Sequence, residues 1–344
     1  MSGNPLGTPG HLGTPGTPGT PGRARAAGWL LGGPLPIPGI CGIIKKYIKE
    51  LDGTILSRFH CHQVPVTALA ALSDGRIASG SCDQTVCVWD AATGENLLTL
   101  EGHTKSVTAL AALSDGKLAS ASDDTTVRIW HTEGDAAGTL LHTLGHHTDS
   151  VAALAELPDG RLASGSWDMT VKVCDVASGA CVLTLAGHTH WVSTLAVLPD
   201  GTLASGSNDG EVRVWSIDGS TTGTCLRTLA DHAGPVRALA VMPDGNDAFR
   251  LAVGLRKKIH IWNTKTGECL RALDVTYSSL TSLIGLRDGR LASSSLDGIV
   301  RVFKPEQGAR ELMLHNRDEA AVLINLPGGM VASGSKRGIT RVWK

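Results

Sequence analysis

Apolar and polar residues alternate in short runs over most of the chain, and the runs are separated by turns that carry Asp-Gly or a close variant. Asp-Gly between alternating apolar residues is a strong β-hairpin signal, because Gly accepts the positive φ that a tight turn requires. These turns are Ser73–Gly75, Ser114–Gly116, Pro158–Gly160, Pro199–Gly201, Pro243–Gly245, Arg287–Gly289 and Pro327–Gly329. The pattern therefore predicts seven hairpins.

The residues around each turn repeat in the same order. A Val-, Leu- and Ala-rich run such as 107–113 precedes the turn, and a strand of small residues such as 118–122 follows it. A third strand then ends in a characteristic position, occupied by Trp89, Trp130, Cys174, Trp215, Trp262, Phe303 and Trp343, at intervals of 41, 44, 41, 47, 41 and 40 residues. Four short strands in a period of about 40–45 residues are typical of a β-propeller.

The repeats resemble those of the WD40 family over residues 54–344. Gly-His at 102–103 and 187–188, with variants at 61–62, 146–147 and 231–232, is similar to the family's glycine-histidine signature. Trp89-Asp90 matches its terminal Trp-Asp, and Cys174-Asp175 matches half of it. The resemblance implies an all-β, seven-bladed propeller. Ile55–Phe59 aligns with outer strands such as Asn96–Leu100 but has no blade before it, so we expect it to pair with the last blade and close the ring.

Residues 1–42 differ in composition from the repeats. Thr-Pro-Gly occurs at 8–10, 14–16, 17–19 and 20–22, and the segment holds no acidic residue. It is predicted to be a disordered low-complexity tail, followed by a short helix or linker over residues 43–53. Prolines interrupt the apolar stretch 26–44, which excludes a membrane-spanning helix of about 20 residues. The basic, acid-poor composition leaves organelle targeting open.

The resemblance also implies that each blade carries a buried, hydrogen-bonded set of His, Ser, Asp and Trp. By position these sets are His62, Ser79, Asp83, Trp89; His103, Ser120, Asp124, Trp130; His147, Ser164, Asp168, with Cys174 in place of Trp; and His188, Ser205, Asp209, Trp215. Because the same residue types recur in successive blades, we interpret them as structural and not as catalytic triads. The later blades depart from the pattern: Thr276 and Asn316 replace His, and Arg256 and Arg337 replace Asp. We expect those blades to be held less rigidly.

Composition narrows the possible functions. A net charge of −1 gives no overall attraction to nucleic acid, and no P-loop, G-x-S-x-G or H-E-x-x-H motif is present. We therefore expect neither an enzyme nor a cofactor. The eight cysteines form no C-x-x-C pair and are predicted to be reduced and mostly buried, in a cytoplasmic or nuclear protein. His60-Cys61-His62 is the one candidate metal cluster, but His62 already belongs to the first set, so no metal site is predicted.

Two tryptophans stand at positions where other blades carry different residues. The loops before the first strand and between the second and third strands of each blade are predicted to gather on one face, and Trp167 and Trp191 occupy such loops on blades three and four. Exposed aromatic residues dominate many protein interfaces. The predicted partner site comprises Trp167, His190, Trp191, Asn208, Arg256, Lys257 and Tyr277, across blades three to five. The alternative is that each tryptophan packs against a neighbouring loop and binds no partner.

The sequence thus predicts a protein–protein interaction scaffold or adaptor, a monomeric propeller within a larger complex, that binds a protein or peptide. Residues 165–173 resemble propellers of ubiquitin-binding and ubiquitin-ligase substrate-receptor proteins, which implies ubiquitin-linked recognition. One alternative is a methyl-lysine reader with Trp167, Trp191 and Tyr277 as an aromatic cage. Another is an enzyme with an unrecognised pocket. The basic loops 256–258 and 336–337 lack the aromatic series of a nucleic-acid site, so no nucleic acid is expected.

Overall fold

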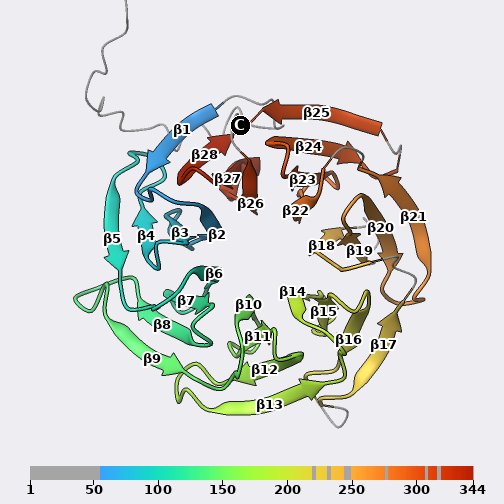
Figure 1. Ribbon diagram of the computed structural model, residues 1–344, viewed down its shortest axis with the longest axis horizontal. Coiled ribbons are helices and arrows are strands. Elements are labelled where there is room, and N and C mark those ends of the chain that lie inside the picture. The colour runs from blue at the N-terminus through green and yellow to red at the C-terminus, as the bar shows by residue number, and fades with distance from the viewer. Residues whose placement is uncertain are drawn as a thin grey trace, which may run out of the picture. The chain divides into compact units, whose positions relative to one another are not determined.

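The computed structural model describes residues 55–218, 222–230, 234–243, 249–275, 278–306, 309–315 and 319–343. Their strands form seven antiparallel four-stranded sheets, arranged as blades around a common centre (Figure 1). The all-β, seven-bladed prediction is confirmed. The predicted tail over residues 1–42 and the helix or linker over residues 43–53 lie outside the described residues. In the part of the chain that is described, no helix is both long and apolar enough to span a membrane.

Each blade contributes four strands, numbered from the centre outward in blades one to six. The strands of blades one to four are β2 (Val66–Ala71), β3 (Ile77–Ser81), β4 (Val86–Trp89), β5 (Asn96–Leu100), β6 (Val107–Ala112), β7 (Lys117–Ser122), β8 (Val127–His131), β9 (Leu140–Leu144), β10 (Val151–Glu156), β11 (Leu162–Ser166), β12 (Thr170–Cys174), β13 (Cys181–Ala186), β14 (Val192–Val197), β15 (Leu203–Ser207), β16 (Val212–Trp215) and β17 (Cys225–Leu229). Blades five to seven comprise β18 (Ala238–Pro243), β19 (Phe249–Gly254), β20 (Lys258–Asn263), β21 (Cys269–Asp274), β22 (Leu280–Gly285), β23 (Leu291–Ser295), β24 (Ile299–Lys304), β25 (Ala309–His315), β26 (Ala320–Asn325), β27 (Val331–Ser335), β28 (Ile339–Trp343) and β1 (Ile55–His60), with the short 3-10 helix η2 (Pro327–Gly329) before β27.

The predicted Asp-Gly turns of blades one to four and six, and the Pro-Gly-Gly turn of blade seven, join the first and second strands, whereas the turn predicted in blade five lies partly outside the described residues. In blade one the Gly75 N–H donates to the Leu72 carbonyl at 3.1 Å, and Gly75 has a φ of +91°. In blade three Gly160 makes the same bond to Leu157, with a φ of +83°. Glycine is needed at these positions because a side chain rarely tolerates this backbone conformation. The repeated sequence signal is therefore a repeated backbone requirement.

The first described strand completes the last blade. β1 pairs antiparallel with β28, with Ile55 opposite Trp343 and His60 opposite Ile339. The order of this sheet is β1-β28-β27-β26, so its outer strand precedes blade one in the sequence and its three inner strands follow blade six (Figure 1). The predicted ring closure is confirmed.

Small residues in the second strands allow neighbouring blades to approach closely. A Cβ atom on Gly80 would lie 2.5 Å from Val107 Cγ1 of blade two, and one on Gly334 would lie 2.6 Å from Val66 Cγ1, across the junction of blades seven and one. Real Cβ atoms do not come this close, so a side chain here would force the blades apart. The core is accordingly shared between neighbouring blades, as where Val86 of blade one packs in a cluster with Trp130 of blade two.

The expectation that all cysteines are reduced and mostly buried is wrong. Cys61, directly after β1, and Cys87, in β4, form a disulfide with their Cα atoms 6.9 Å apart. Ring closure brings them together, which their spacing in the sequence does not reveal. The other described cysteines differ in exposure: Cys174 is buried, Cys82 and Cys181 are half-buried, and Cys225 and Cys269 are exposed. Cys41 lies outside the described residues. The cytoplasmic or nuclear location inferred from reduced thiols loses that support.

Candidate functional site

A relay of hydrogen bonds runs through blade two. Trp130 Nε1 donates to Ser120 Oγ at 2.8 Å, Ser120 Oγ lies 2.8 Å from His103 Nε2, and His103 Nδ1 lies 2.8 Å from Asp124 Oδ2. The ionised Asp124 carboxylate only accepts, so His103 Nδ1 carries a proton. Burial favours the neutral imidazole, so His103 Nε2 accepts from the Ser120 hydroxyl, whose oxygen accepts in turn from the Trp130 indole N–H. This assigns a neutral His103 whose proton lies on Nδ1 and is donated to the Asp124 carboxylate.

The same relay recurs in neighbouring blades. In the order Trp–Ser, Ser–His and His–Asp, its distances are 2.9, 2.9 and 2.8 Å in blade one and 2.8, 2.7 and 2.9 Å in blade four. Blade three keeps the last two bonds, at 2.8 and 2.7 Å, and has Cys174 in place of the tryptophan. The structure therefore brings together all four sets named from the sequence. Their serines are buried, which suits a structural role.

The surroundings of each pair favour neutral histidine and ionised aspartate. Burial lowers the pKa of His103, His147 and His188, even though the facing aspartates act in the opposite direction. Burial alone would raise the pKa of the Asp124 carboxyl. Hydrogen bonds from the Thr126 hydroxyl, the Thr104 N–H and His103 outweigh burial and lower this pKa to about 2.

Blades five to seven hold their loops with other residues. In blade six Asp297 pairs with Arg301 Nη2 at 2.6 Å and accepts from Ser295 Oγ at 2.6 Å. In blade seven Trp343 Nε1 still donates to Ser333 Oγ, at 2.7 Å. Blade five has Val253 at the serine position of its second strand. Thr276 and Asn316 lie outside the described residues, so the lower rigidity of this half of the ring stays a prediction.

In blade four the relay also fixes the loop that carries Trp191. Asp209 Oδ2 accepts from the Thr189 N–H at 3.0 Å, and Ser207 Oγ donates to the His190 carbonyl at 3.0 Å. The Asn208 N–H donates to the Trp191 carbonyl at 2.9 Å. The loop before β14 is thus tied at three points to the turn between β15 and β16.

Blade three joins the corresponding loop and turn in the same way. The Trp167 N–H donates to the Ser150 carbonyl at 2.9 Å, so the turn between β11 and β12 lies against the loop before β10. Equivalent backbone bonds link the two loops in blade one, from Cys82 to Pro65, and in blade six, from Leu296 to Ser279. The face that carries both kinds of loop is called the loop face below.

Trp167 and Trp191 pack against each other on the loop face. Their rings are stacked, with centroids 4.2 Å apart and planes 9° apart. The His190 ring meets the Trp191 ring edge-on, with centroids 4.8 Å apart. His190 Nδ1 also accepts from the backbone N–H of Trp191 at 2.8 Å. Trp167 is half-buried, whereas Trp191 remains 36% exposed. The tryptophans therefore pack locally and still present indole surface to solvent. Trp167, His190 and Trp191 form the aromatic patch.

The stacked geometry does not form the methyl-lysine cage considered from the sequence. Parallel rings 4.2 Å apart are in contact with each other and leave no space for a cation between them. Trp167 and Trp191 are therefore not opposite walls of a cage. Tyr277, the third predicted wall, lies outside the described residues.

The basic residues of the predicted site lie on the loop between β19 and β20 of blade five. Arg256 and Lys257 are exposed. The Arg256 carbonyl accepts from the Leu280 N–H of blade six at 3.3 Å, and the Lys257 carbonyl accepts from the Val275 N–H at 2.9 Å. Their loop is thus tied toward blade six. The structure brings Trp167, His190, Trp191 and Asn208 together, whereas the described backbone contacts of Arg256 and Lys257 are with Leu280 and Val275.

The sequence reasoning missed Met169. This residue lies in the same turn as Trp167, is 44% exposed and has a φ of +70°. The matching position is Gly210 in blade four and Gly298 in blade six, both with positive φ. A large apolar residue in a left-handed backbone position is unusual, so aligning the repeats could have identified it. It adds apolar surface to the turn that carries Trp167.

Among the residues that the structure describes, two groups of side chains bring potential metal ligands within 4.8 Å of one another: Cys61, His62 and Cys87, and His188, Asp209 and Glu211. In the first group the sulfurs are bonded to each other, and both imidazole nitrogens take part in the blade-one relay. In the second group the imidazole belongs to the blade-four relay, and the glutamate pairs with Arg213 at 2.8 Å. The donor atoms of both groups are thus engaged within the protein.

Comparison with known proteins identifies the repeats. The family model described as WD domain, G-beta repeat matches residues 53–90, 94–131, 138–175, 179–216 and 223–263. These five matches cover more than half of the chain, and the remaining strands complete two further blades of the same form. No curated protein is significantly similar to the chain. The family match and the closed ring of four-stranded blades together show that the chain belongs to the WD40 family and forms a seven-bladed WD40 propeller.

Proposed function

We propose that the chain is a non-catalytic adaptor that binds a protein or peptide on its loop face over blades three to five, with the aromatic patch as anchor. The observation that carries this proposal is the stack of Trp167 on Trp191. Part of the Trp191 indole remains exposed, on a loop that the blade-four relay holds in place. The propeller scaffold suits such a role, since WD40 propellers commonly serve as protein-interaction scaffolds.

Rigidity supports an anchoring role for Trp191. A side chain already fixed by stacking and by its own backbone bonds loses little conformational entropy when a partner covers it. Interface tryptophans of this kind often account for about 2 kcal/mol or more of binding free energy, which is roughly a 30-fold change in affinity. Met169 would extend the apolar contact in blade three.

The exposed cations of blade five indicate the charge of such a partner. Arg256 and Lys257, on the loop between β19 and β20, and Lys258, the first residue of β20, are all exposed. A partner that extends from the aromatic patch toward blade five would be acidic where it meets them, and its binding would weaken as salt is added. Ubiquitin-linked recognition is a narrower form of the proposal. It rests on the resemblance of residues 165–173, a segment that includes Trp167 and Met169.

A comparison of protein interactions tests the proposal. Partners of the intact chain and of Trp191→Ala and Trp167→Ala/Trp191→Ala variants are compared by quantitative affinity purification and mass spectrometry. The control is Val182→Ala, because Val182 is also apolar, lies in blade three and is 51% exposed, but sits in the outer strand β13. Thermal unfolding confirms that all variants are folded.

We expect a set of partners to be lost from both tryptophan variants and retained by Val182→Ala. Purified partners should then bind Trp191→Ala at least about 10-fold more weakly, whereas Trp191→Phe, which keeps a stacking ring, should lose less. Identical interactions for all variants would contradict the proposal. Titration with ubiquitin tests the narrower form, since it requires a signal that disappears in Trp191→Ala.

A further inference from the structure

Blade three places two cysteines opposite each other in its outer pair of strands. Cys174 is the last residue of β12, Cys181 is the first residue of β13, and the register of the two strands pairs them directly. Residues directly opposite each other in an antiparallel pair project from the same face of the sheet. Cys181 accordingly packs against the buried apolar cluster that contains Cys174. The two thiols are therefore neighbours, at the end of the blade away from the loop face.

The pair arises from a substitution in a single repeat. The residues at the two positions in the other blades are Trp89 and Asn96, Trp130 and Leu140, Trp215 and Cys225, Trp262 and Cys269, Phe303 and Arg310, and Trp343 and Ile55. The outer position thus holds cysteine in blades three to five, but the inner position holds an aromatic residue in every blade except blade three. Cys174 therefore brings a second thiol to the place where blades one, two and four have an indole bonded to the relay serine.

The spacing of the two strands suits a covalent bond. Residues directly opposite in antiparallel strands have Cα atoms about 4.5 or 5.5 Å apart, depending on the hydrogen-bonding pattern, whereas the two Cα atoms of a disulfide lie about 4.4–6.8 Å apart. Both strand spacings fall within the range that a disulfide spans. Cys174 and Cys181 can therefore be joined with little movement of β12 or β13.

The two thiols differ in their access to solvent, which sets the order in which they react. Burial raises the pKa of the Cys174 thiol to about 12, and the neighbouring Cys181 thiol adds to this shift. A thiol with such a pKa is a poor first nucleophile at neutral pH. Cys181 is half-buried, so a dissolved reagent can reach its sulfur. Once Cys181 has reacted it can no longer ionise, which removes its effect on the pKa of Cys174.

We propose that Cys174 and Cys181 are a redox-active dithiol that a small-molecule disulfide, such as oxidised glutathione, converts to an internal disulfide. The Cys181 thiolate attacks one sulfur of the small disulfide, breaks its S–S bond and expels one thiolate. The Cys174 sulfur then loses its proton, attacks the Cys181 sulfur of the mixed disulfide and expels the second thiolate. Two protein thiols are thus oxidised to one disulfide. The small disulfide is reduced to two thiols, which take up the two protons.

The bond would link β12 to β13 within the blade that carries Trp167. β12 begins shortly after the turn that holds Trp167 and Met169, and it ends at Cys174. Blades one, two and four have a permanent hydrogen bond from tryptophan to serine at this end, whereas blade three would have a link whose presence depends on redox conditions. The site is separate from the aromatic patch, and the inference does not rest on the proposed function.

Oxidation of the full chain in glutathione buffers tests the proposal. The folded protein is incubated at a series of ratios of reduced to oxidised glutathione, quenched with acid, unfolded and labelled with iodoacetamide. Cleavage after Lys172 and Arg213 releases fragment 173–213, which contains Cys174 and Cys181 and no other cysteine. Mass spectrometry then distinguishes the doubly labelled dithiol, the mixed disulfide with glutathione and the internal disulfide, which carries no label and is two hydrogen atoms lighter than the unlabelled dithiol.

We expect the internal disulfide to become the main form of fragment 173–213 in excess oxidised glutathione and to disappear again in excess reduced glutathione. Two labelled thiols in the most oxidising buffer would overturn the proposal. So would a lasting glutathione adduct on Cys181 without the internal bond. These outcomes are measured on the wild type, so they do not depend on the folding of any variant.

Three variants test the order of the two steps, after thermal unfolding in reductant has confirmed that they are folded. Cys174→Ala should accumulate glutathione on Cys181, because the second step is blocked. Cys181→Ser should keep Cys174 as a labelled thiol, because Cys174 is buried. The matched control is Cys225→Ser, which changes the same outer position in blade four, opposite Trp215, and should form the internal disulfide as the wild type does. Loss of the internal disulfide in this control would overturn a direct reaction of the pair.

Discussion

Cys61 is bonded to Cys87, so the residue that directly follows the closing strand β1 is covalently attached to β4 of blade one. β1 itself pairs with β28 in the sheet of blade seven. The disulfide therefore spans the junction at which the ring closes, and it couples the closing strand to both of the blades that meet there.

Removal of this bond should destabilise the propeller. We expect Cys61→Ser to lower the free energy of unfolding by about 2–4 kcal/mol under oxidising conditions, the usual range for a native disulfide. A reducing agent should lower the melting temperature of the wild type toward that of the variant. Thermal unfolding with and without reductant measures both effects. Cys225→Ser, which alters an exposed free thiol, is the control. A wild-type melting temperature that ignores reductant would contradict the prediction.

The relay serines should differ in importance according to their partners. Ser120→Ala leaves two buried groups without their partner, Trp130 Nε1 and His103 Nε2, whereas Ser164→Ala affects only the histidine of its set, because blade three has Cys174. We expect Ser120→Ala to lower the free energy of unfolding by about 1–2 kcal/mol more than Ser164→Ala does, because each buried polar group that loses its partner destabilises the fold. Urea unfolding of both variants gives the comparison. Equal costs would show that the tryptophan bond contributes nothing.

The relays also predict loss of stability in acid. The pKa of His103 is below its unfolded value of 6.5, so the unfolded chain takes up protons first and stability falls as the pH drops below about 6.5. The pKa of Asp124 is about 2 in the folded protein and 3.8 in the unfolded chain. The stabilisation that its carboxylate provides is therefore fully present well above pH 3.8 and is lost as the pH falls toward 2.

For Asp124 the difference between the folded and unfolded pKa contributes about 2 kcal/mol to the free energy of unfolding at neutral pH. Urea unfolding monitored by tryptophan fluorescence between pH 7.5 and 3 should show the decline. The gap in stability between the wild type and Asp124→Asn should narrow toward the acid end. A gap that stays constant across this range would mean that the carboxylate is not stabilised as the structure indicates.

Loss of the closing strand should be far more harmful than loss of the N-terminal tail. Deletion of residues 45–60 removes all of β1 and leaves β28 as an exposed sheet edge, which favours aggregation. Deletion of residues 1–40 leaves that pairing intact. Soluble yield and size-exclusion profiles compare the two deletions. A soluble, monomeric protein without residues 45–60 would refute the importance of closure.

The fold was predictable because its determinants are local and repeated. Asp-Gly turns, second strands of small residues and the periodic His, Ser and Asp positions each recur at the propeller period. Even the closing strand is predictable, because a segment with the pattern of an outer strand precedes the first blade. Features that depend on contacts between blades were not predictable. The Cys61–Cys87 bond requires the ring to be closed, and the stack of Trp167 on Trp191 depends on side-chain conformations that spacing does not specify.

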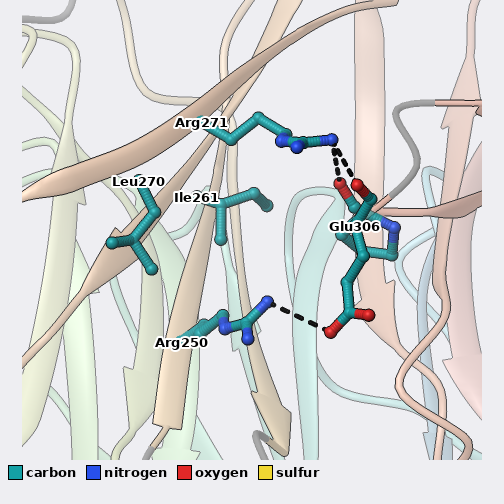
Figure 2. A pocket seen from close by; sticks show the side chains of 6 residues that line it. Arg250, Ile261, Leu270, Arg271 and Glu306 are labelled. Atoms are coloured by element: carbon teal, nitrogen blue, oxygen red, sulfur yellow. Dashed lines mark hydrogen bonds and ion pairs between the residues drawn. The ribbon is translucent and has the colours of Figure 1, made fainter.

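The candidate sites likewise combine features that the repeat pattern predicts with features that depend on contacts between blades. The repeat pattern predicts that Trp167 and Trp191 lie on one face of adjacent blades, but how much of each ring is exposed and how Met169 adds to the patch depend on the folded conformation of the two loops. The pocket in Figure 2 combines residues from three strands of blade five with Pro305 and Glu306 from a loop of blade six, so no single repeat contains it. In blade six, Arg301 supports Asp297, a substitution for the usual histidine that pattern matching alone did not suggest.

The pairing of β1 with β28 has a consequence for protein synthesis. The strand that leaves the ribosome first among those of the propeller is the one whose partner is made last. β1 therefore remains without its partner strand while the intervening blades are translated, and blade seven forms only after β28 has emerged. An unpaired strand is open to wrong pairing throughout this interval. Slow translation of the segment that leads to β28 would prolong the exposure, whereas a chaperone that covers β1 would protect the nascent chain.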